Sequence, residues 1–343
     1  MSKKLLAFLY NVRHNYPDPN DPQTFLEADF DDPETIEYFI KHLKSCGYNV
    51  LPIEADLKSK EVLEKNKTDI FLAFNYSEIV LGEEKHIQIT RYLEELQIPF
   101  TGACDEAQMT IRNKIKAKKV MSEHGIPVLN DQVFKTGKEI LNKDLNFPLL
   151  VKPSCQGSSA GITNKSVVES LDELYFQVGE ILQRFGDDVL VEPFLDGREF
   201  SIPIIGNNPD ILPIIEPDFS NLPQGFKKLD SYEVKWIFEE EEGGKGHLMC
   251  PANIDNHLKN KLEKIVLDVW RVLNIKDFCR IDLRCDRNTN PYVLEINSPA
   301  GLIPPEVSLT SYLPLSARVM GLSFEDLLRK IIDSALERYK ILV

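Results

Sequence analysis

Long apolar segments are missing from this chain of 343 residues: no stretch approaches the 18 or more apolar residues that cross a bilayer. The weakly basic start, MSKKLLAFLY, has a short apolar run and no small-residue cleavage site, so it predicts a strand rather than a signal peptide. Basic residues are outnumbered, with 40 Lys and Arg against 54 Asp and Glu and a net charge of −14, which disfavours nucleic acid as a partner. We expect a cytoplasmic protein that binds neither membranes nor nucleic acid.

Cysteine and histidine patterns that hold zinc are also absent. The six cysteines show no C-x-x-C spacing, and the six histidines show no H-x-x-x-H or H-x-x-E-H spacing. A chain of this length folds without disulfides, so free thiols are expected and any metal should be held by oxygen. With 17 Gly, 21 Pro, 43% hydrophobic and 27% charged residues, the composition excludes disorder and collagen. The length predicts about two or three domains.

The first hundred residues alternate between apolar runs and helical patterns, which is typical of a parallel sheet with helices on its faces. Asp32 can cap the first helix, Pro33 suits its first turn and Gly47 suits its end. We expect one α/β domain over residues 1–104. The predicted strands are 5–10, 49–53 and 69–74, and the further predicted helices are 57–65 and 83–96.

Beyond residue 104 the pattern is typical of α+β proteins, and we divide it into domains at 105–195 and 196–343. Ser170 to Glu173 form a capping box at the start of a helix. The acidic, glycine-containing run at 239–246 suits a solvated, mobile loop, with a plain surface loop as the alternative. The other predicted helices are 112–123, 256–273 and 323–339, and the predicted strands are 149–153, 189–193, 199–205, 211–215, 277–283 and 292–296.

One motif is an apolar strand that delivers Lys152 into a loop of small residues, 154–161. Backbone amides of such a loop can approach phosphate oxygens, and the lysine adds a positive charge. The P-loop pattern G-x-x-x-x-G-K-[ST] is absent, and here the lysine precedes the loop. The segment could bind a polyphosphate, with an ordinary flexible turn as the alternative.

A second motif is a predicted hairpin that carries Arg280 and Asp282 on one strand and Glu295 and Asn297 on the other. Residues two apart on a strand face the same way, so each pair shares a face. If the two faces coincide, two carboxylates and an amide oxygen converge beside a guanidinium. These are ligands that Mg²⁺ prefers, and an exposed salt bridge across the hairpin is the alternative.

A third motif covers residues 189–200 and combines a strand, a turn and another strand. Its extended backbone could meet the edge of a purine, with Glu199 placed for ribose hydroxyls. Taken alone, this pattern favours a purely structural role.

The order of four motifs, K-P-x-x-x-G-S-S-x-G, E-x-x-L-x-G-x-E-F, R-I-D and V-L-E-I-N, resembles the ATP-grasp fold and, within it, the D-alanine–D-alanine ligases. The resemblance runs from about Ile98 to the chain end and includes Met320-Gly321-Leu322-Ser323-Phe324. It implies an α/β and α+β architecture in which a Rossmann-like parallel-sheet domain on the substrate side precedes two ATP-grasp subdomains. The first subdomain, 105–195, would carry the phosphate loop, and the second, 196–343, the metal site and lid.

By this resemblance the site residues take the following roles. Lys114 and Lys152 would grip the ATP phosphates, and Arg280 would stabilise the oxyanion of a tetrahedral intermediate. The run 239–246 would lie in the active-site lid, and Lys235 would contact phosphate. The phosphate loop would close through Gln156, Gly157, Ser158 and Ser159, adenosine would be held by Glu192, Phe194, Leu195 and Glu199, and two Mg²⁺ ions, with Mn²⁺ as an alternative, by Asp282, Glu295 and Asn297.

The implied reaction uses the γ-phosphate of ATP to convert a carboxylate into an acyl phosphate, which an amine then attacks to give an amide, ADP and phosphate. Two divalent cations and lysines would neutralise the transferred phosphoryl group, and a closed lid would keep water from the acyl phosphate. The partners would be a small-molecule carboxylate and a small-molecule amine, and the resemblance also implies a homodimer.

The departures from the family lie on the substrate side. The N-terminal glycine-rich motif is replaced by 11–17 and the H-G-x-x-G-E-D-G loop by 74–78. Of the family's Glu-Ser-Tyr substrate triad only Ser158 is kept, because Trp236 stands where the tyrosine would be. The segment T-x-P-G-M-T becomes Ser298-Pro299-Ala300-Gly301-Leu302-Ile303, and an alignment without gaps places Glu306 at the serine that binds the acceptor's carboxylate.

A carboxylate at position 306 would repel the carboxylate of D-alanine unless one is protonated or a cation intervenes. We therefore expect an intact ATP half with an altered donor and acceptor, Glu306 favouring a neutral or cationic acceptor group. The alternative for Glu306 is that it points to solvent or pairs with Arg318. Other functions that the sequence leaves open are a genuine D-alanine–D-alanine ligase, a catalytically silent ATP-binding regulatory module, and a carboxylase-like or peptide-modifying ATP-grasp enzyme.

Overall fold

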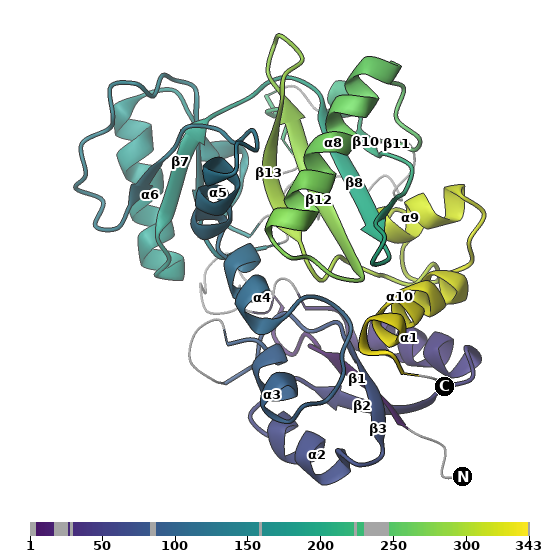
Figure 1. Cartoon of the computed structure of the whole chain (residues 1–343). Coiled ribbons are helices and arrows are strands. Elements are labelled where there is room, and N and C mark those ends of the chain that lie inside the picture. The colour runs from purple at the N-terminus through teal and green to yellow at the C-terminus, as the bar shows by residue number, and fades with distance from the viewer. Residues whose placement is uncertain are drawn as a thin grey trace.

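The computed structural model describes residues 5–16, 27, 30–82, 87–157, 160–222, 225–229 and 247–341. Figure 1 shows three groups of elements, with the N-terminal sheet below and two further sheets above it. In the described part of the chain, no helix combines the length and the apolar character that crossing a bilayer requires.

The N-terminal group is built on a parallel sheet of order β2-β1-β3. Its strands are β1 (Leu5–Tyr10), β2 (Asn49–Glu54) and β3 (Ile70–Asn75), and its helices are α1 (Pro33–Ser45), α2 (Ser59–Asn66), α3 (Thr90–Glu95) and α4 (Asp105–Arg112). The rings of Phe8 and Phe39 stack at 4.7 Å between β1 and α1. Because loops that follow parallel strands gather at one sheet edge, Asn11 after β1 and Tyr76 after β3 lie on the same side.

The middle group has an antiparallel sheet of order β4-β7-β5-β6, whose apolar residues pack against α6. Its elements are α5 (Lys114–Glu123), β4 (Gln132–Phe134), β5 (Leu149–Pro153), β6 (Val167–Val168), α6 (Leu171–Phe185) and β7 (Val189–Pro193). Strand β5 is buried along its whole length, so it holds the backbone of Lys152 rigidly in the core.

The C-terminal group has an antiparallel sheet of order β13-β12-β8-β9 that packs against α8. Its elements are β8 (Glu199–Ile205), β9 (Asp210–Ile211), β10 (Glu216–Pro217), β11 (Leu248–Met249), α8 (Asn256–Val272), β12 (Phe278–Cys285), β13 (Pro291–Asn297), α9 (Tyr312–Val319) and α10 (Phe324–Tyr339). The register shifts between Asp282 and Leu283, at a β-bulge of the kind that redirects side chains next to sites.

The last helix, α10, packs against the N-terminal group, close to α1 in Figure 1, and its cluster also includes Ile205 of β8 and Phe278 of β12. Its Leu327, Leu328 and Ile331 are fully buried in one cluster with Phe8 and Phe39. A capping box in which Ser323 and Asp326 exchange hydrogen bonds fixes where this helix begins. The two ends of the chain therefore share a hydrophobic core.

Several local expectations need correction. Within expected helix 83–96, the described residues 87–96 are helical only over α3, and the Ile87 carbonyl instead accepts from the Val80 amide; residues 83–86 lie outside the described residues. Expected helix 112–123 begins at Lys114, where Asn113 accepts from the amide of Lys116, and the separate helix α4 precedes it.

Two expected caps also differ. Asp32 precedes α1 but does not cap it, because its carboxylate accepts from Arg13 Nη1 at 3.1 Å. Ser170 caps α6, yet the Glu173 carboxylate accepts from the amide of Glu169, so half of the predicted box is missing. The strand expected at 211–215 is reduced to β9, with one isolated bridge between Ile215 and Ser201.

Candidate functional site

The β12–β13 hairpin brings its four polar side chains to one face of the sheet. In the antiparallel register Arg280 lies opposite Asn297 and Asp282 lies opposite Glu295. Directly opposed residues of an antiparallel pair point the same way, with Cβ atoms about 5 Å apart. The two faces expected from the alternation of side chains are thus one face of the β12–β13 hairpin.

Asp282 is the centre of the hydrogen bonds on this face. Its Oδ1 accepts from Arg280 Nε at 2.9 Å and Ser201 Oγ at 2.7 Å, and its Oδ2 accepts from Arg280 Nη2 and Asn297 Nδ2 at 2.8 Å each. Burial would lower the pKa of the Arg280 guanidinium, but the Asp282 charge outweighs burial and raises it. Arg280 is therefore a permanent cation whose position is fixed by a bidentate ion pair.

The donor set of this face fits a divalent cation of the hard type. Two carboxylates and an amide supply oxygen ligands, and among the residues the structure describes no group of three or more His, Cys, Asp and Glu is arranged to hold a metal ion. Asp282 already accepts several N–H donors, so a bound cation must displace at least one. Rotation of the Asn297 amide would withdraw its Nδ2 from Asp282 and present its Oδ1 beside the two carboxylates.

Lys114 connects this hairpin to the small-residue loop after β5. Its Nζ lies 3.4 Å from Glu295 Oε2 and donates to the carbonyl of Gln156 at 2.5 Å. The Gln156 side chain is in turn held by Asp187 through a 2.6 Å hydrogen bond. One lysine thus lies between the expected cation ligands and the expected phosphate loop, although the two segments are far apart in sequence.

A buried ion triad lies beneath this loop. Glu192 on β7 is 2% exposed, and its two carboxylate oxygens lie 2.5 Å from Lys152 Nζ and 2.6 Å from Lys118 Nζ. Burial raises the pKa of Glu192, but the charges of Lys152 and Lys118 outweigh it and lower this pKa to about 2. Glu192, expected at adenosine, has its carboxylate occupied by two lysines in this structure.

The Glu192→Gln variant is expected to be less stable than the wild type by about 3 kcal/mol at pH 7, because Lys152 and Lys118 lose their shared counter-charge and only Lys118 keeps Asp131, at 3.0 Å. The depressed pKa of Glu192 means that its stabilisation is complete above pH ~4.5 and is lost as the pH falls towards about 2. Urea unfolding at pH 7 and at pH 3 measures both effects. The exposed Glu180→Gln exchange on α6 is the matched control.

Between pH 7 and pH 3 the wild type should lose more stability than Glu192→Gln, since the variant has no carboxyl to protonate at this position. Equal stability of the two proteins at pH 7 would contradict the importance of the triad. The same loss of stability between pH 7 and pH 3 in both proteins would also contradict it.

The residues expected at adenosine are held by an arginine that the sequence reasoning did not identify. Arg284 Nη1 donates to Glu199 Oε2 at 3.1 Å, and its guanidinium carbon lies 5.1 Å from the Phe194 ring centre. Its Nη2 donates to the carbonyl of Lys228. Leu195 is partly buried in the turn that follows β7. Arg284 therefore orients both Glu199 and Phe194.

The substrate-side expectations have different outcomes. Glu306 neither pairs with Arg318, which donates to the carbonyl of Leu309, nor points freely to solvent, because it contacts His42 at 3.0 Å. Gly301 is exposed, and a Cβ there would meet no atom within 4 Å. The other expected residues, Ser158, Ser159, Lys235, Trp236 and the run 239–246, lie outside the described residues.

Two tyrosines that the sequence reasoning missed also lie on this side. The ring centre of Tyr312 lies 4.9 Å from the Arg280 guanidinium carbon. The Tyr76 hydroxyl accepts from the amide of Leu302 at 3.1 Å and interacts with Asp31, whose pKa burial raises to about 6. The position of Tyr76 directly after a strand of the parallel sheet could have indicated that it lies near the site. Nothing in the local sequence indicates such a position for Tyr312.

A sequence signal did exist for two of the other missed residues. Arg284 continues the alternation of Arg280 and Asp282 along β12, and Lys118 lies one helical turn after Lys114 on α5. The grouped charges suit a polyphosphate with a divalent cation: two acids and an amide on a hairpin, and several lysines opposite.

The family model described as "D-ala D-ala ligase C-terminus" matches residues 120–333. A protein of Sinorhizobium fredii named "Uncharacterized protein y4sG" is 30% identical over 334 residues, 95% of this chain and 93% of that protein. A D-alanine–D-alanine ligase of Desulforudis audaxviator is 32% identical over 301 residues, 86% of this chain and 90% of the relative.

Among solved structures, a D-alanine–D-alanine ligase from Bacillus anthracis complexed with ATP is similar in fold, with a TM-score of 0.71. The match covers 98% of this chain and 99% of that one, at 22% identity. A second structure of the ligase from the same organism gives a TM-score of 0.69 over 99% of both chains, at 23% identity.

Proposed function

Because this chain belongs to the D-alanine–D-alanine ligase family and is an ATP-dependent ligase that forms C–N bonds, we propose that it makes a peptide-like amide through an acyl phosphate. The family membership confirms the resemblance seen in the motifs, and the ATP-grasp fold with a parallel N-terminal sheet is confirmed by the likeness in structure. The proposal rests above all on the position of Lys114 between Glu295 and the Gln156 carbonyl.

The first step of the proposed mechanism is attack of a substrate carboxylate oxygen on the γ-phosphorus of ATP. The bond from this phosphorus to the β,γ-bridging oxygen breaks, which releases ADP and leaves an acyl phosphate. Lys114 and Lys152 bind the phosphates and offset their charge. Lys152 starts in contact with Glu192, so the triad also fixes where its ammonium lies.

In the second step the amine nitrogen attacks the acyl carbon and the carbonyl electrons move to oxygen. Arg280, held by Asp282, faces that developing negative charge. Collapse of the tetrahedral intermediate expels inorganic phosphate, and the nitrogen loses a proton to give the amide. Divalent cations, which we propose to be two, would be held by Asp282, Glu295 and Asn297 and would supply charge neutralisation at the phosphates.

We further propose that the carboxylate and the amine are not both D-alanine. The loops after β1 and β3 carry Arg13 and Glu78 at positions where the family has other residues, and both side chains are engaged in the protein. Arg13 binds Asp32, and Glu78 accepts from Arg112 Nη1 at 3.0 Å. The contacts of Arg13 and Glu78 support a substrate pocket whose chemistry differs from that of the family. Both residues follow strands of the parallel sheet, on the side where we propose that the first substrate binds.

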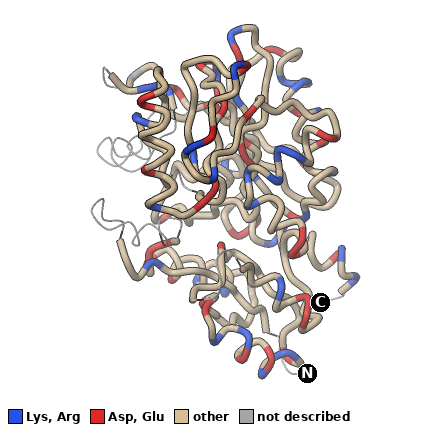
Figure 2. Tube along the Cα trace, turned by 90° about the vertical axis from the view of Figure 1, so that its left-hand side faces the viewer, with Lys and Arg blue, Asp and Glu red and all other residues tan. Residues whose placement is uncertain are grey.

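Both partners are proposed to be small molecules, within a homodimeric enzyme that binds no nucleic acid. The net charge of −14 supports the last point. So does Figure 2, in which Lys and Arg are interspersed with Asp and Glu along the described trace rather than collected in a stripe.

ADP release from paired amino acids and amines tests the proposal. We expect at least one other pair to exceed D-alanine alone by about tenfold or more in kcat/KM, the range that altered polar contacts produce. Omission of the carboxylate is the control for background ATP hydrolysis. Efficient turnover with D-alanine alone would contradict the altered specificity, and background turnover with every pair would contradict ligase activity.

A further inference from the structure

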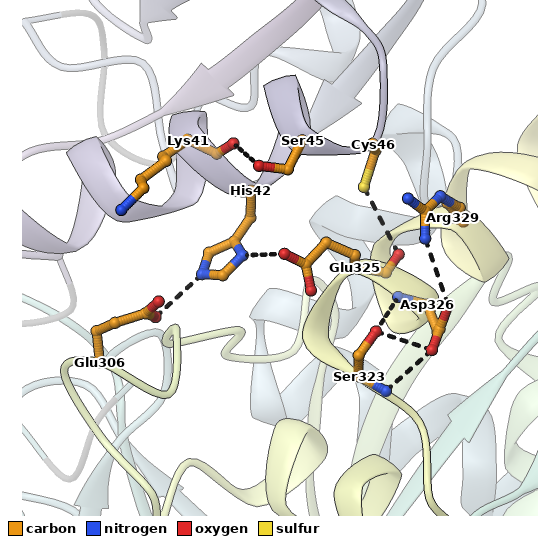
Figure 3. A network of polar contacts seen from close by, with 9 residues as sticks. All are labelled: Lys41, His42, Ser45, Cys46, Glu306, Ser323, Glu325, Asp326 and Arg329. Atoms are coloured by element: carbon orange, nitrogen blue, oxygen red, sulfur yellow. Dashed lines mark hydrogen bonds and ion pairs between the residues drawn. The ribbon is translucent and has the colours of Figure 1, made fainter.

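His42 lies between two carboxylates that come from distant parts of the chain (Figure 3). Its Nε2 is 3.0 Å from Glu306 Oε2, in the segment after β13, and its Nδ1 is 2.8 Å from Glu325 Oε1, in the first turn of α10. His42 itself belongs to α1. One imidazole therefore joins three elements.

This geometry requires a charged ring. A neutral imidazole has one N–H and can donate to one carboxylate, whereas an imidazolium donates from both nitrogens. Burial lowers the pKa of His42, but the hydrogen bonds to Glu306 and Glu325 outweigh it and raise the pKa. Burial raises the pKa of each carboxyl, but the hydrogen bond to His42, a backbone hydrogen bond and nearby positive charges together outweigh it and lower the pKa.

The surroundings of the ring contain charges of both signs. Lys41, next to His42 on α1, acts on Glu306, and Arg329 on α10 acts on Glu325. Asp326 binds Arg329 at 3.4 Å, so it offsets that cation. The ring also packs edge-on against Phe324 on α10 at 4.9 Å, and the neighbouring Cys46 thiol on α1 contacts the carbonyl of Glu325. Both the Glu306 and the Glu325 carboxylate can thus form an ion pair with the charged His42 ring.

The segment that Glu306 anchors, 298–311, connects two parts of the proposed site. It follows Asn297 directly and ends at Tyr312, whose ring packs on Arg280. It is held at Leu302 by Tyr76, and internally by the amide of Ile303, which donates to Ser311 Oγ at 3.3 Å. A shift of this segment would therefore move both the expected cation ligand Asn297 and the ring beside Arg280.

We propose that the His42 imidazolium is a positioning residue that fixes segment 298–311 against α1 and α10 and so orders the substrate side of the site. This inference rests on the proposed ligase function. Loss of the proton from His42 releases Glu306 or Glu325, because only one carboxylate then keeps a donor. The affinity for the carboxylate and amine substrates, rather than for ATP, therefore depends on this proton.

The packing of α1 against α10 does not need this ion pair. Phe39 meets Phe324 at 5.6 Å, and Ile36 and Leu43 are buried in the same cluster as Leu328. A His42→Gln variant should thus fold with a nearly unchanged melting temperature, which separates a positioning role from a purely structural one.

Hydrogen–deuterium exchange and the NMR titration of the His42 ring test the proposal without any substrate. In the full-length wild type we expect a ring pKa raised above that of an ordinary histidine, and slow exchange over 300–311. In His42→Gln we expect at least about tenfold faster exchange there. His42→Arg, which keeps a charge and several donors, should restore protection, and the exposed His257→Gln on α8 is the matched control.

With a substrate pair in hand, His42→Gln should raise the KM values for carboxylate and amine by about tenfold while the KM for ATP stays within twofold. Wild-type substrate KM should rise with pH through the ring's pKa, and the variant's should not. A neutral ring at pH 7, or unchanged exchange in His42→Gln, would overturn the inference. If no pair is turned over but exchange responds as expected, the ligase proposal fails while the positioning role of His42 stands.

Discussion

The Glu295→Gln exchange is expected to reduce kcat for ATP-dependent amide formation by about 10³-fold, or ~4 kcal/mol of transition-state stabilisation. The amide removes a negative charge from the face that would hold the divalent cation, and it weakens the contact with Lys114 at 3.4 Å. Side-chain volume is retained, and Glu295 is 31% exposed at the side chain, so the fold should be preserved. Steady-state ADP release against Mg²⁺ concentration measures the loss.

The Mg²⁺ concentration for half-maximal activity should rise in this variant, and chelation should abolish wild-type turnover until Mg²⁺ is restored. Glu180→Gln on α6, the same exchange at an exposed site, should match the wild type in both respects. Wild-type kcat and Mg²⁺ dependence in Glu295→Gln would remove this residue from the cation site.

Replacement of Arg280 by Lys should lower kcat by about 10² to 10³-fold with little change in the KM for ATP. A lysine keeps the charge but cannot donate in parallel to both oxygens of Asp282, so its ammonium is not fixed opposite the developing oxyanion. It also loses the planar face that packs on Tyr312. Single-turnover measurements of amide formation would separate chemistry from product release.

The same hairpin supplies a matched control for this exchange. Arg287 lies in the turn between β12 and β13, is 85% exposed and makes a bidentate pair with Asp196. Arg287→Lys should therefore leave kcat unchanged. A fully active Arg280→Lys enzyme would show that orientation of the guanidinium does not matter for the reaction.

The hairpin face and the buried strands were predictable because their rules are local. Alternation of side chains fixes which residues share a face, so Arg280 and Asp282 could be paired before any fold was known. Strands β1, β5, β7 and β8 follow the predicted boundaries because each is a mostly apolar segment between turn residues.

Contacts between distant segments were not predictable in this way. His42 and Glu306 are separated by 264 positions, and the two lysines at Glu192 come from a helix and a strand that meet only in the folded chain. The ungapped placement of Glu306 gave no sign of a histidine on α1. Helix caps failed where a long-range partner competed, as when Arg13 took the carboxylate of Asp32.

The position of α10 affects how this protein folds during its synthesis on the ribosome. The sheet β2-β1-β3 is translated before the other two sheets. The apolar surface of its core that packs against Leu327, Leu328 and Ile331 stays exposed until α10 has been translated. During synthesis the nascent N-terminal group therefore exposes an aggregation-prone apolar surface while the two following sheets are translated. The core of the N-terminal group is completed only when α10 packs onto it, after translation of segment 298–311, which carries Glu306.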